Sequence, residues 1–154
     1  MLRYAAILFA LLLASSALRT YAHEGHEHFS AGEPGDPKKP ARVVDVSMRE
    51  HGTKMIYVPS RIEIRRGEQI RFVITNEGIY NHEFMLATLA ENRKHGELMR
   101  KFPDMEHEDP NAVTVPPYVV AELLWKFTKK GEFEFACLLP GHYEAGMHGT
   151  IVVK

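Results

Sequence analysis

From residue 42 onward, apolar and polar side chains alternate along short runs of the chain, for example in VVDVSM, MIYVP, RIEIRRG and QIRFVIT. A period of two is typical of β-strands that bury one face. The side chains predicted to point inward are Val44, Val46, Met48, Ile62, Ile64, Ile70, Phe72 and Ile74. Similar runs continue in YNHEFML, VVAELLWKFTKKG, EFEFACL and MHGTIVVK. Many short strands at this spacing predict an all-β sandwich.

One stretch has the spacing of a helix instead. Residues 88–102 read TLAENRKHGELMRKF, and we expect a short helical insertion there, followed by a loop. The apolar residues that could form its buried stripe are Leu89, Leu98, Met99 and Phe102, with Gly96 as an interruption.

The first 22 residues have the composition of a secretory signal peptide. Arg3 provides a positive charge, Ala5–Ala14 is an unbroken apolar run, and small residues stand at Thr20 and Ala22 before the predicted cleavage point. The apolar run is too short to span a bilayer, although a retained signal anchor is the alternative. No later segment is long or apolar enough to span. We therefore expect export to the periplasm and no stable insertion into a membrane.

The next segment is polar and rich in glycine and proline. It begins HEGHEH, which puts His23, His26 and His28 close to the expected mature terminus. We expect a flexible arm over residues 23–41, because the segment has little apolar surface to bury. Its histidines could capture a second, weakly bound copper ion, or the arm could simply be solvated. The predicted organisation is a signal peptide at 1–22, this arm, and one folded domain at 42–154.

Net charge excludes some classes of partner. Loss of residues 1–22 would remove two of the 19 basic residues and none of the 20 acidic ones, which leaves a formal charge of about −3. Nucleic-acid binding requires a basic surface, so we expect no such partner. The mature length suits one domain, and we expect a monomer.

The single cysteine is unusual for an exported chain. In an oxidising compartment it could form an intermolecular bridge, remain a reactive thiol, or bind a metal as a thiolate. Cys137 opens the loop CLLPGHYEAGM, in which His142 and Met147 follow at equal intervals. One thiolate, two imidazoles and a weak thioether are the ligands of an electron-transfer copper site. His82 in NEGIYNHEF supplies a second histidine, and zinc is disfavoured because it rarely accepts a thioether.

Two motifs resemble those of the cupredoxins, the type 1 blue copper proteins. They are IYVPSRIEIRRGEQIRFVITNEGIYNHEF and CLLPGHYEAGMHGTIVV, and the resemblance spans about 42–154. It implies a Greek-key β-sandwich that holds one type 1 copper ion, and it implies that Asn81 braces the cysteine loop. The ligands carried over are His82, Cys137, His142 and Met147. The loop departs from the plastocyanin pattern, because the four residues between Cys137 and His142 make a longer spacing.

Other methionines and histidines stand at short intervals that could suit Cu(I), since thioethers are soft ligands. One set is Met48, His51 and Met55, and another is His95, Met99, Met105 and His107. Core packing is the alternative for the first set, and transient binding is the most that the second set indicates. His148 lies beside Met147, but we do not expect it to be a ligand.

The sequence supports two functional hypotheses. The His-rich start resembles that of copper-induced periplasmic cupredoxins, which implies copper homeostasis or tolerance and copper-handling partners. The alternative is a mobile electron carrier that meets a redox partner through an apolar patch of Leu138, Leu139, Pro140 and Tyr143. An enzyme would need a second, catalytic copper centre. The chain offers no such pair of ligands in a second domain, so we expect no enzymatic activity.

Overall fold

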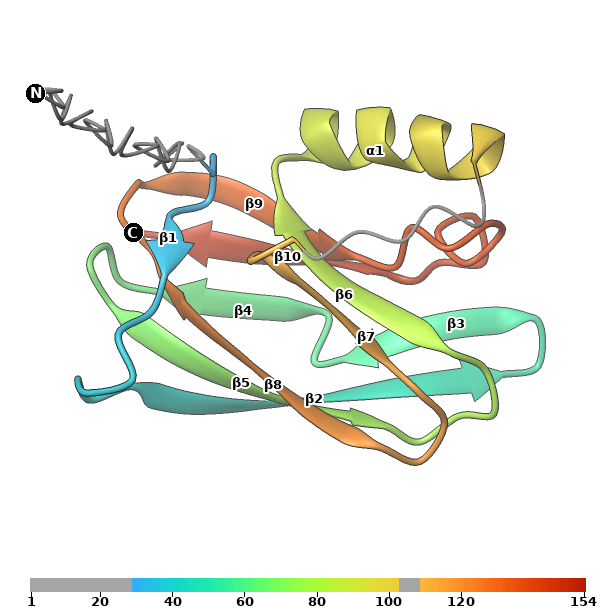
Figure 1. Cartoon of the computed structure of the whole chain (residues 1–154), viewed down its shortest axis with the longest axis horizontal. Helices are drawn as coiled ribbons and strands as arrows, with labels where there is room; N and C mark the ends of the chain where they lie inside the picture. Colours follow the sequence, from blue (N-terminus) through green and yellow to red (C-terminus); the bar gives the residue numbers. More distant parts are fainter. Residues whose placement is uncertain (1–28, 103–108) are drawn as a thin grey trace, which may run out of the picture.

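The computed structural model describes residues 29–102 and 109–154, and within them the strands form two five-stranded sheets (Figure 1). In spatial order, the first sheet contains β1 (Glu33–Pro34), β8 (Val120–Lys126), β5 (Gln69–Asn76), β2 (Arg42–His51) and β3 (Lys54–Val58). The second contains β4 (Arg61–Ile64), β10 (His148–Val153), β9 (Gly131–Ala136), β6 (His82–Ala87) and β7 (Ala112–Val115). The predicted all-β sandwich is therefore confirmed.

The core lies between the two sheets, where the alternating side chains meet. In β5 every second residue is fully buried, including Ile70, Phe72 and Ile74, and Phe84 of β6 packs against Phe72 across the sandwich with ring centroids 5.2 Å apart. The predicted inward positions are buried, apart from Val44, which is half-buried at the edge of the core. Period-two burial follows because successive side chains of a strand point to opposite faces.

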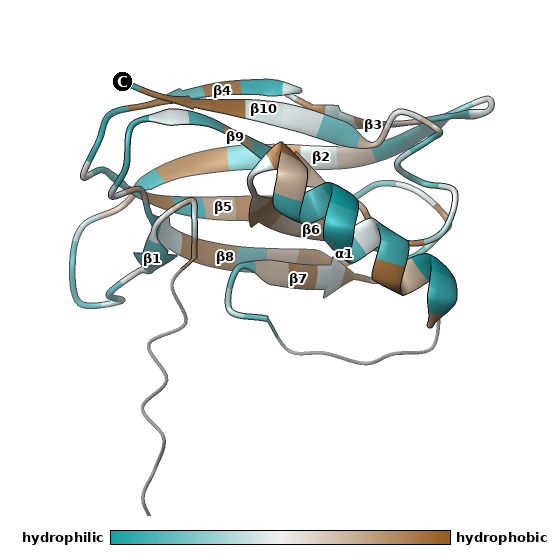
Figure 2. Ribbon diagram, turned by 90° about the horizontal axis from the view of Figure 1, so that it is seen from above, coloured by the Kyte–Doolittle hydropathy of each residue, from teal (hydrophilic) through white to brown (hydrophobic). Residues whose placement is uncertain are grey.

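The predicted helix exists as α1 (Leu89–Lys101) and lies against the outer face of the second sheet, with contacts to β6 and β9 (Figure 1). Its start is set locally: Thr88 and Glu91 form a capping box that satisfies backbone N–H groups of the first turn. Figure 2 shows that much of its surface is hydrophilic.

The predicted apolar stripe of this helix is confirmed for Met99 and wrong for its other three members. Leu89, Leu98 and Phe102 are exposed, and the buried face is formed by Asn92, Gly96 and Met99. These three follow the spacing of one helical face. A Cβ on Gly96 would lie 3.8 Å from Leu138, an ordinary van der Waals distance, so this face of the helix lies beside the cysteine loop. Asn92 donates a hydrogen bond to Glu134 of β9, so a polar contact replaces part of the expected apolar one.

The prediction of a flexible arm over 23–41 is wrong for the part that the structure describes, residues 29–41. Glu33 and Pro34 pair with β8, and Ala31 is fully buried in the core. The Phe29 ring packs edge-on against Trp125, with centroids 5.3 Å apart. This segment folds onto the sandwich because it covers the free edge of β8 and accepts the indole hydrogen bond of Trp125 at the Ala31 carbonyl. Residues 1–28, with the predicted signal peptide and His23, His26 and His28, lie outside the described part.

Candidate metal centre

Three strands bring the predicted ligands to one end of the sandwich. His82 is the first residue of β6, and the loop that begins with Cys137 joins the end of β9 to the start of β10. Ala136 and His148 are paired across that hairpin, and the Cys137 N–H donates to the Met147 carbonyl at 3.0 Å. The backbone therefore holds both ends of the loop together beside His82.

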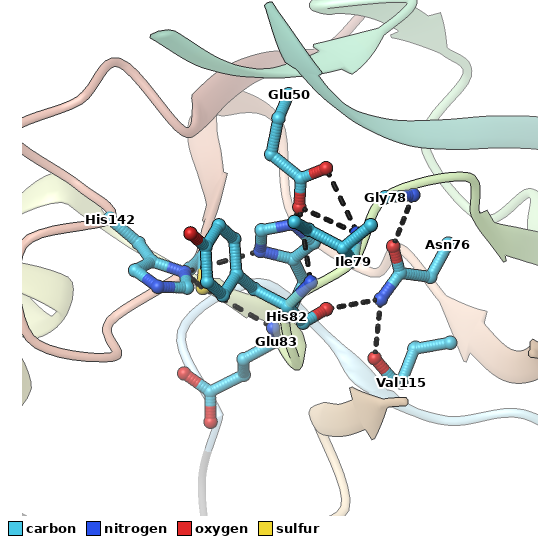
Figure 3. Close-up of polar contacts among 10 residues, drawn as sticks. Glu50, Asn76, Gly78, Ile79, His82, Glu83, Val115 and His142 are labelled. Atoms are coloured by element: carbon cyan, nitrogen blue, oxygen red, sulfur yellow. Dashed lines mark hydrogen bonds and ion pairs between the residues drawn. The ribbon is translucent and has the colours of Figure 1, made fainter. Parts of the chain in front are cut away.

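The donor atoms converge as a metal site requires. His82 Nδ1 lies 3.1 Å from His142 Nδ1, and the Cys137 Sγ lies 3.3 Å from the same nitrogen. Two nitrogens that each lie about 2.0 Å from one ion are about 3.3 Å apart at a tetrahedral angle, so this spacing fits a shared ion. Figure 3 shows His82 and His142 pointing toward each other. Among residues 29–102 and 109–154, this is the only such cluster of histidine, cysteine or acidic side chains.

Burial differs among these groups. Cys137 and His82 are fully buried, whereas His142 is half-buried and is the most exposed of these three predicted ligands. Burial lowers the pKa of His142, and neighbouring His82 lowers it further against the opposing effect of Glu50. His142 is therefore neutral near pH 7 and can offer a lone pair to a metal.

Met147 is fully buried, and its N–H donates to the His142 carbonyl at 3.1 Å. Its main chain is thus held against both His142 and Cys137. This placement agrees with a thioether on one side of the cluster, and Met147 as the weak fourth ligand stays a prediction.

The cysteine loop is braced by Glu83, which sequence reasoning missed. The Glu83 N–H donates to Cys137 Sγ at 3.3 Å, and its buried carboxylate accepts the Leu138 N–H at 3.2 Å. Asn81, expected in this role, is exposed. The available signal was a charged residue inside an otherwise apolar strand, since a buried carboxylate needs a partner.

Glu50 is a second residue that sequence reasoning missed. Its Oε1 lies 2.8 Å from Nε2 of His82, on the side of the ring away from the other ligands. Burial raises the pKa of Glu50, but hydrogen bonds from His82 and from the Ile79 and Tyr80 N–H groups outweigh it and hold the pKa below its usual range. No local signal could have found it, because Glu50 and His82 are 32 positions apart.

Asn76 shapes the turn that delivers His82. Its side-chain amide donates to the carbonyls of Tyr80 and Val115, both at 2.8 Å, while its carbonyl accepts the Gly78 N–H at 2.9 Å (Figure 3). One fully buried amide thus ties the end of β5 to both the 77–81 turn and the end of β7. The turn is therefore positioned by a satisfied buried polar group, which makes its geometry specific.

Cys137 is expected to be an inert thiol in the metal-free protein. Burial raises its pKa to about 12, against the lowering effect of hydrogen bonds from the Glu83 and Leu139 N–H groups. The thiolate is the nucleophile, so a buried protonated thiol reacts slowly. Native apoprotein should resist a disulfide reagent at pH 7 and react fully once denatured. Rapid native modification or a disulfide-linked dimer would contradict this expectation and revive the intermolecular bridge.

The side chains of the first additional set, Met48, His51 and Met55, do not share one environment. The β2–β3 hairpin forms, but Met48 is buried in the core while His51 is exposed and Met55 is half-buried. Core packing therefore accounts for Met48.

Of the second set, only His95 and Met99 lie in the described part of the chain. Met99 is on the buried face of α1 and His95 is half-buried on the same helix, whereas Met105 and His107 lie outside the described residues. His148 is exposed and stacks on Tyr143 with ring centroids 4.8 Å apart, outside the three-residue cluster.

Comparison with known proteins agrees with this centre. Residues 44–154 match the copper binding proteins of the plastocyanin/azurin family. The chain is similar to the copper-resistant cuproprotein CopI of Rubrivivax gelatinosus, with 45% identity over 99% of this chain and 97% of that protein. It is 32% identical to the copper-resistant cuproprotein CopI of Pseudomonas aeruginosa, over 96% of this chain and 93% of that protein.

Comparison with solved structures also finds a protein of similar fold. The structure of auracyanin B superposes with a TM-score of 0.65 and 18% identity, over 80% of this chain and 96% of that chain. The converging thiol and imidazoles and the matched family agree on copper as the metal. The chain therefore belongs to the plastocyanin/azurin family of copper-binding proteins, as its cupredoxin motifs predict.

Proposed function

We propose that this protein protects the cell against excess copper by holding copper in the periplasm at the centre formed by His82, Cys137 and His142, with Met147 as the weak fourth ligand. The convergence of three donors within 4.8 Å carries the proposal. The names of the two relatives, copper-resistant cuproproteins that align over nearly the whole chain, support it. The periplasmic location rests on the signal peptide predicted at residues 1–22.

The donor set suits this role chemically. A soft thiolate and imidazoles bind both oxidation states of copper, and two of the side chains that would hold the ion, Cys137 and His82, are fully buried. We infer a binding protein without enzymatic activity, because the relatives that align over nearly the whole chain are named as copper-resistant cuproproteins. No helix in the described part of the chain is long and apolar enough to cross a membrane. Copper-handling proteins of the same compartment are the partners proposed.

Deletion of the gene from its host is expected to lower the copper concentration that stops growth. Wild-type protein should restore tolerance, Cys137→Ala should not, and His51→Ala should restore it, because that exposed histidine lies outside the centre. Growth on a copper gradient, with protein levels checked by immunoblot, makes the measurement. Unchanged tolerance in the deletion strain would contradict the proposal.

An electron carrier is the second candidate, and a surface feature favours it. Ile79 and Tyr80 are more than half exposed, as are Tyr118 in the connection from β7 to β8 and Val120 at the start of β8. Both segments are tied to Asn76, through the Tyr80 carbonyl and through the Val119 carbonyl. Together, residues 79–80 and 118–120 form an apolar patch at the metal end.

This patch contains none of the four residues predicted for it. Leu138 is buried and Leu139 and Tyr143 are half-buried, so only Pro140 of the predicted set is exposed. The Tyr80 ring lies 6.4 Å from that of His142, which puts the patch beside the least buried ligand. A deletion strain with normal tolerance, together with a purified protein that binds one redox-active copper, would favour the carrier.

A further inference from the structure

Glu50 reaches the metal centre from the opposite sheet. It lies on β2 next to the hairpin to β3, where it pairs with Met55, while His82 begins β6 of the second sheet. Its side chain is only 17% exposed, and its Oε1 is 2.8 Å from His82 Nε2. Figure 3 shows the carboxylate above the His82 ring, on the far side from His142. A carboxylate in this position touches a predicted copper ligand without itself being a donor to the metal.

The surrounding backbone is shaped to receive this carboxylate. The Ile79 N–H donates to Oε1 at 3.2 Å and to Oε2 at 3.0 Å, and the Tyr80 N–H donates to Oε1 at 3.3 Å. A side chain at Gly78 would collide with the carboxylate, so glycine there lets the carboxylate occupy its present position. Glu50 therefore holds the turn that precedes His82 as well as the histidine itself.

The contact has a consequence for the imidazole. Because the carboxylate accepts a hydrogen bond, the proton of neutral His82 stays on Nε2 and the lone pair stays on Nδ1, which faces Cys137 and His142. A carboxylate behind a metal-bound histidine also raises the basicity of the ligand. Its negative charge, largely removed from solvent, interacts more favourably with Cu(II) than with Cu(I).

We propose that Glu50 is a positioning residue of the copper centre, which holds His82 as the Nδ1-binding tautomer and whose charge favours the oxidised metal. This inference rests on copper binding by His82, Cys137 and His142, as in the proposed function. The proposed arrangement is a carboxylate hydrogen-bonded to a metal-binding histidine, with the carboxylate on one sheet and the histidine on the other.

The decisive variant is Glu50→Gln in the copper-loaded protein, because glutamine preserves the size of the side chain and an acceptor oxygen but removes the charge. At a fixed applied potential, the ratio of Cu(I) to Cu(II) should rise about tenfold, which for a one-electron couple is an upward shift of about 59 mV. Redox titration followed by the visible band measures it. Glu77→Gln is the matched control: Glu77 bonds Ser47 and Arg49 and makes no contact with His82. We expect no shift for that variant.

Glu50→Ala tests the tautomer. Loss of the acceptor should reduce copper affinity by about 10–100-fold, the usual effect of removing a partner behind a metal ligand. In the diamagnetic Cu(I) protein, the slowly exchanging Nε2–H proton of His82 should be visible by NMR in wild type and lost in Glu50→Ala. If the alanine variant does not fold, the wild-type spectrum still tests the tautomer, because the absence of a slowly exchanging Nε2–H proton of His82 in wild type would overturn that role.

The outcomes are distinguishable. Equal potentials for Glu50→Gln, Glu77→Gln and wild type would overturn the role of the charge, and an unchanged His82 proton signal in folded Glu50→Ala would overturn the tautomer role. Both results would leave the copper centre intact. A wild-type protein that shows no thiolate-to-copper band would instead overturn the centre, and this inference with it.

Discussion

Cys137→Ala is expected to abolish the intense visible absorption of the copper-loaded protein and to weaken copper binding by more than about 100-fold. The absorption of such a site comes from the thiolate bonded to copper, and alanine removes the one soft anionic donor of the cluster. Loss of a ligand should exceed the 10–100-fold effect of losing a residue behind a ligand. Copper titration with the visible spectrum and metal content recorded together makes the measurement.

His51→Ala is the control for this experiment, since it removes an exposed metal-binding side chain outside the cluster. It should keep the band and one tightly bound copper. A band retained in Cys137→Ala would show that the absorption does not arise from this thiolate. Further copper that binds to wild type without added colour would belong to other sites, for which His23, His26 and His28 are the candidates.

Trp125→Ala is expected to lower the free energy of unfolding by about 3–5 kcal/mol, the usual cost of truncating a fully buried large aromatic residue. The indole is fully buried, packs on Phe29, and donates to the Ala31 carbonyl at 3.3 Å. Its removal leaves a cavity and loosens residues 29–34 from β8. Such a loss is a large part of the 5–15 kcal/mol that holds a typical domain together. Urea unfolding followed by far-ultraviolet circular dichroism gives the value.

Val43→Ala is the matched comparison, because Val43 lies on β2 but is 55% exposed. It should change stability by no more than about 0.5 kcal/mol. A double-mutant cycle of Trp125→Ala with Phe29→Ala should reveal a coupling energy, since residues in contact are not additive. If Trp125→Ala resembled Val43→Ala, the packing of Phe29 and Ala31 on Trp125 would contribute nothing to the stability of the domain.

Most of the strands and much of the metal centre could be predicted because their signals are local. Alternating burial in QIRFVIT follows from strand geometry alone, and Thr88 with Glu91 marks the helix start within one turn. Cys137 and His142 lie in one loop closed by a hairpin, so their spacing already implies that their side chains can meet. His82 was found from its motif, and the fold then placed its Nδ1 within reach of His142.

Other features depend on which distant residues meet. The helix buries Asn92 and Gly96 beside Met99. The other apolar residues of the expected stripe stay exposed, because the surface beneath offers Glu134 as a partner for Asn92. Phe29 and Ala31 look like part of a polar arm until Trp125 provides a surface to cover. Neither the buried face of the helix nor the packing of Phe29 and Ala31 could be predicted from a short stretch of sequence.

The sequence by itself determined the strand pattern, the position of the helix and the metal-binding chemistry of His82, Cys137 and His142, because period and spacing act over a few residues. Only the tertiary structure decided that Glu83 braces the thiol and that Glu50 holds His82. Those contacts join residues on separate strands and sheets, and a buried carboxylate acquires its role from the donors that packing brings to it.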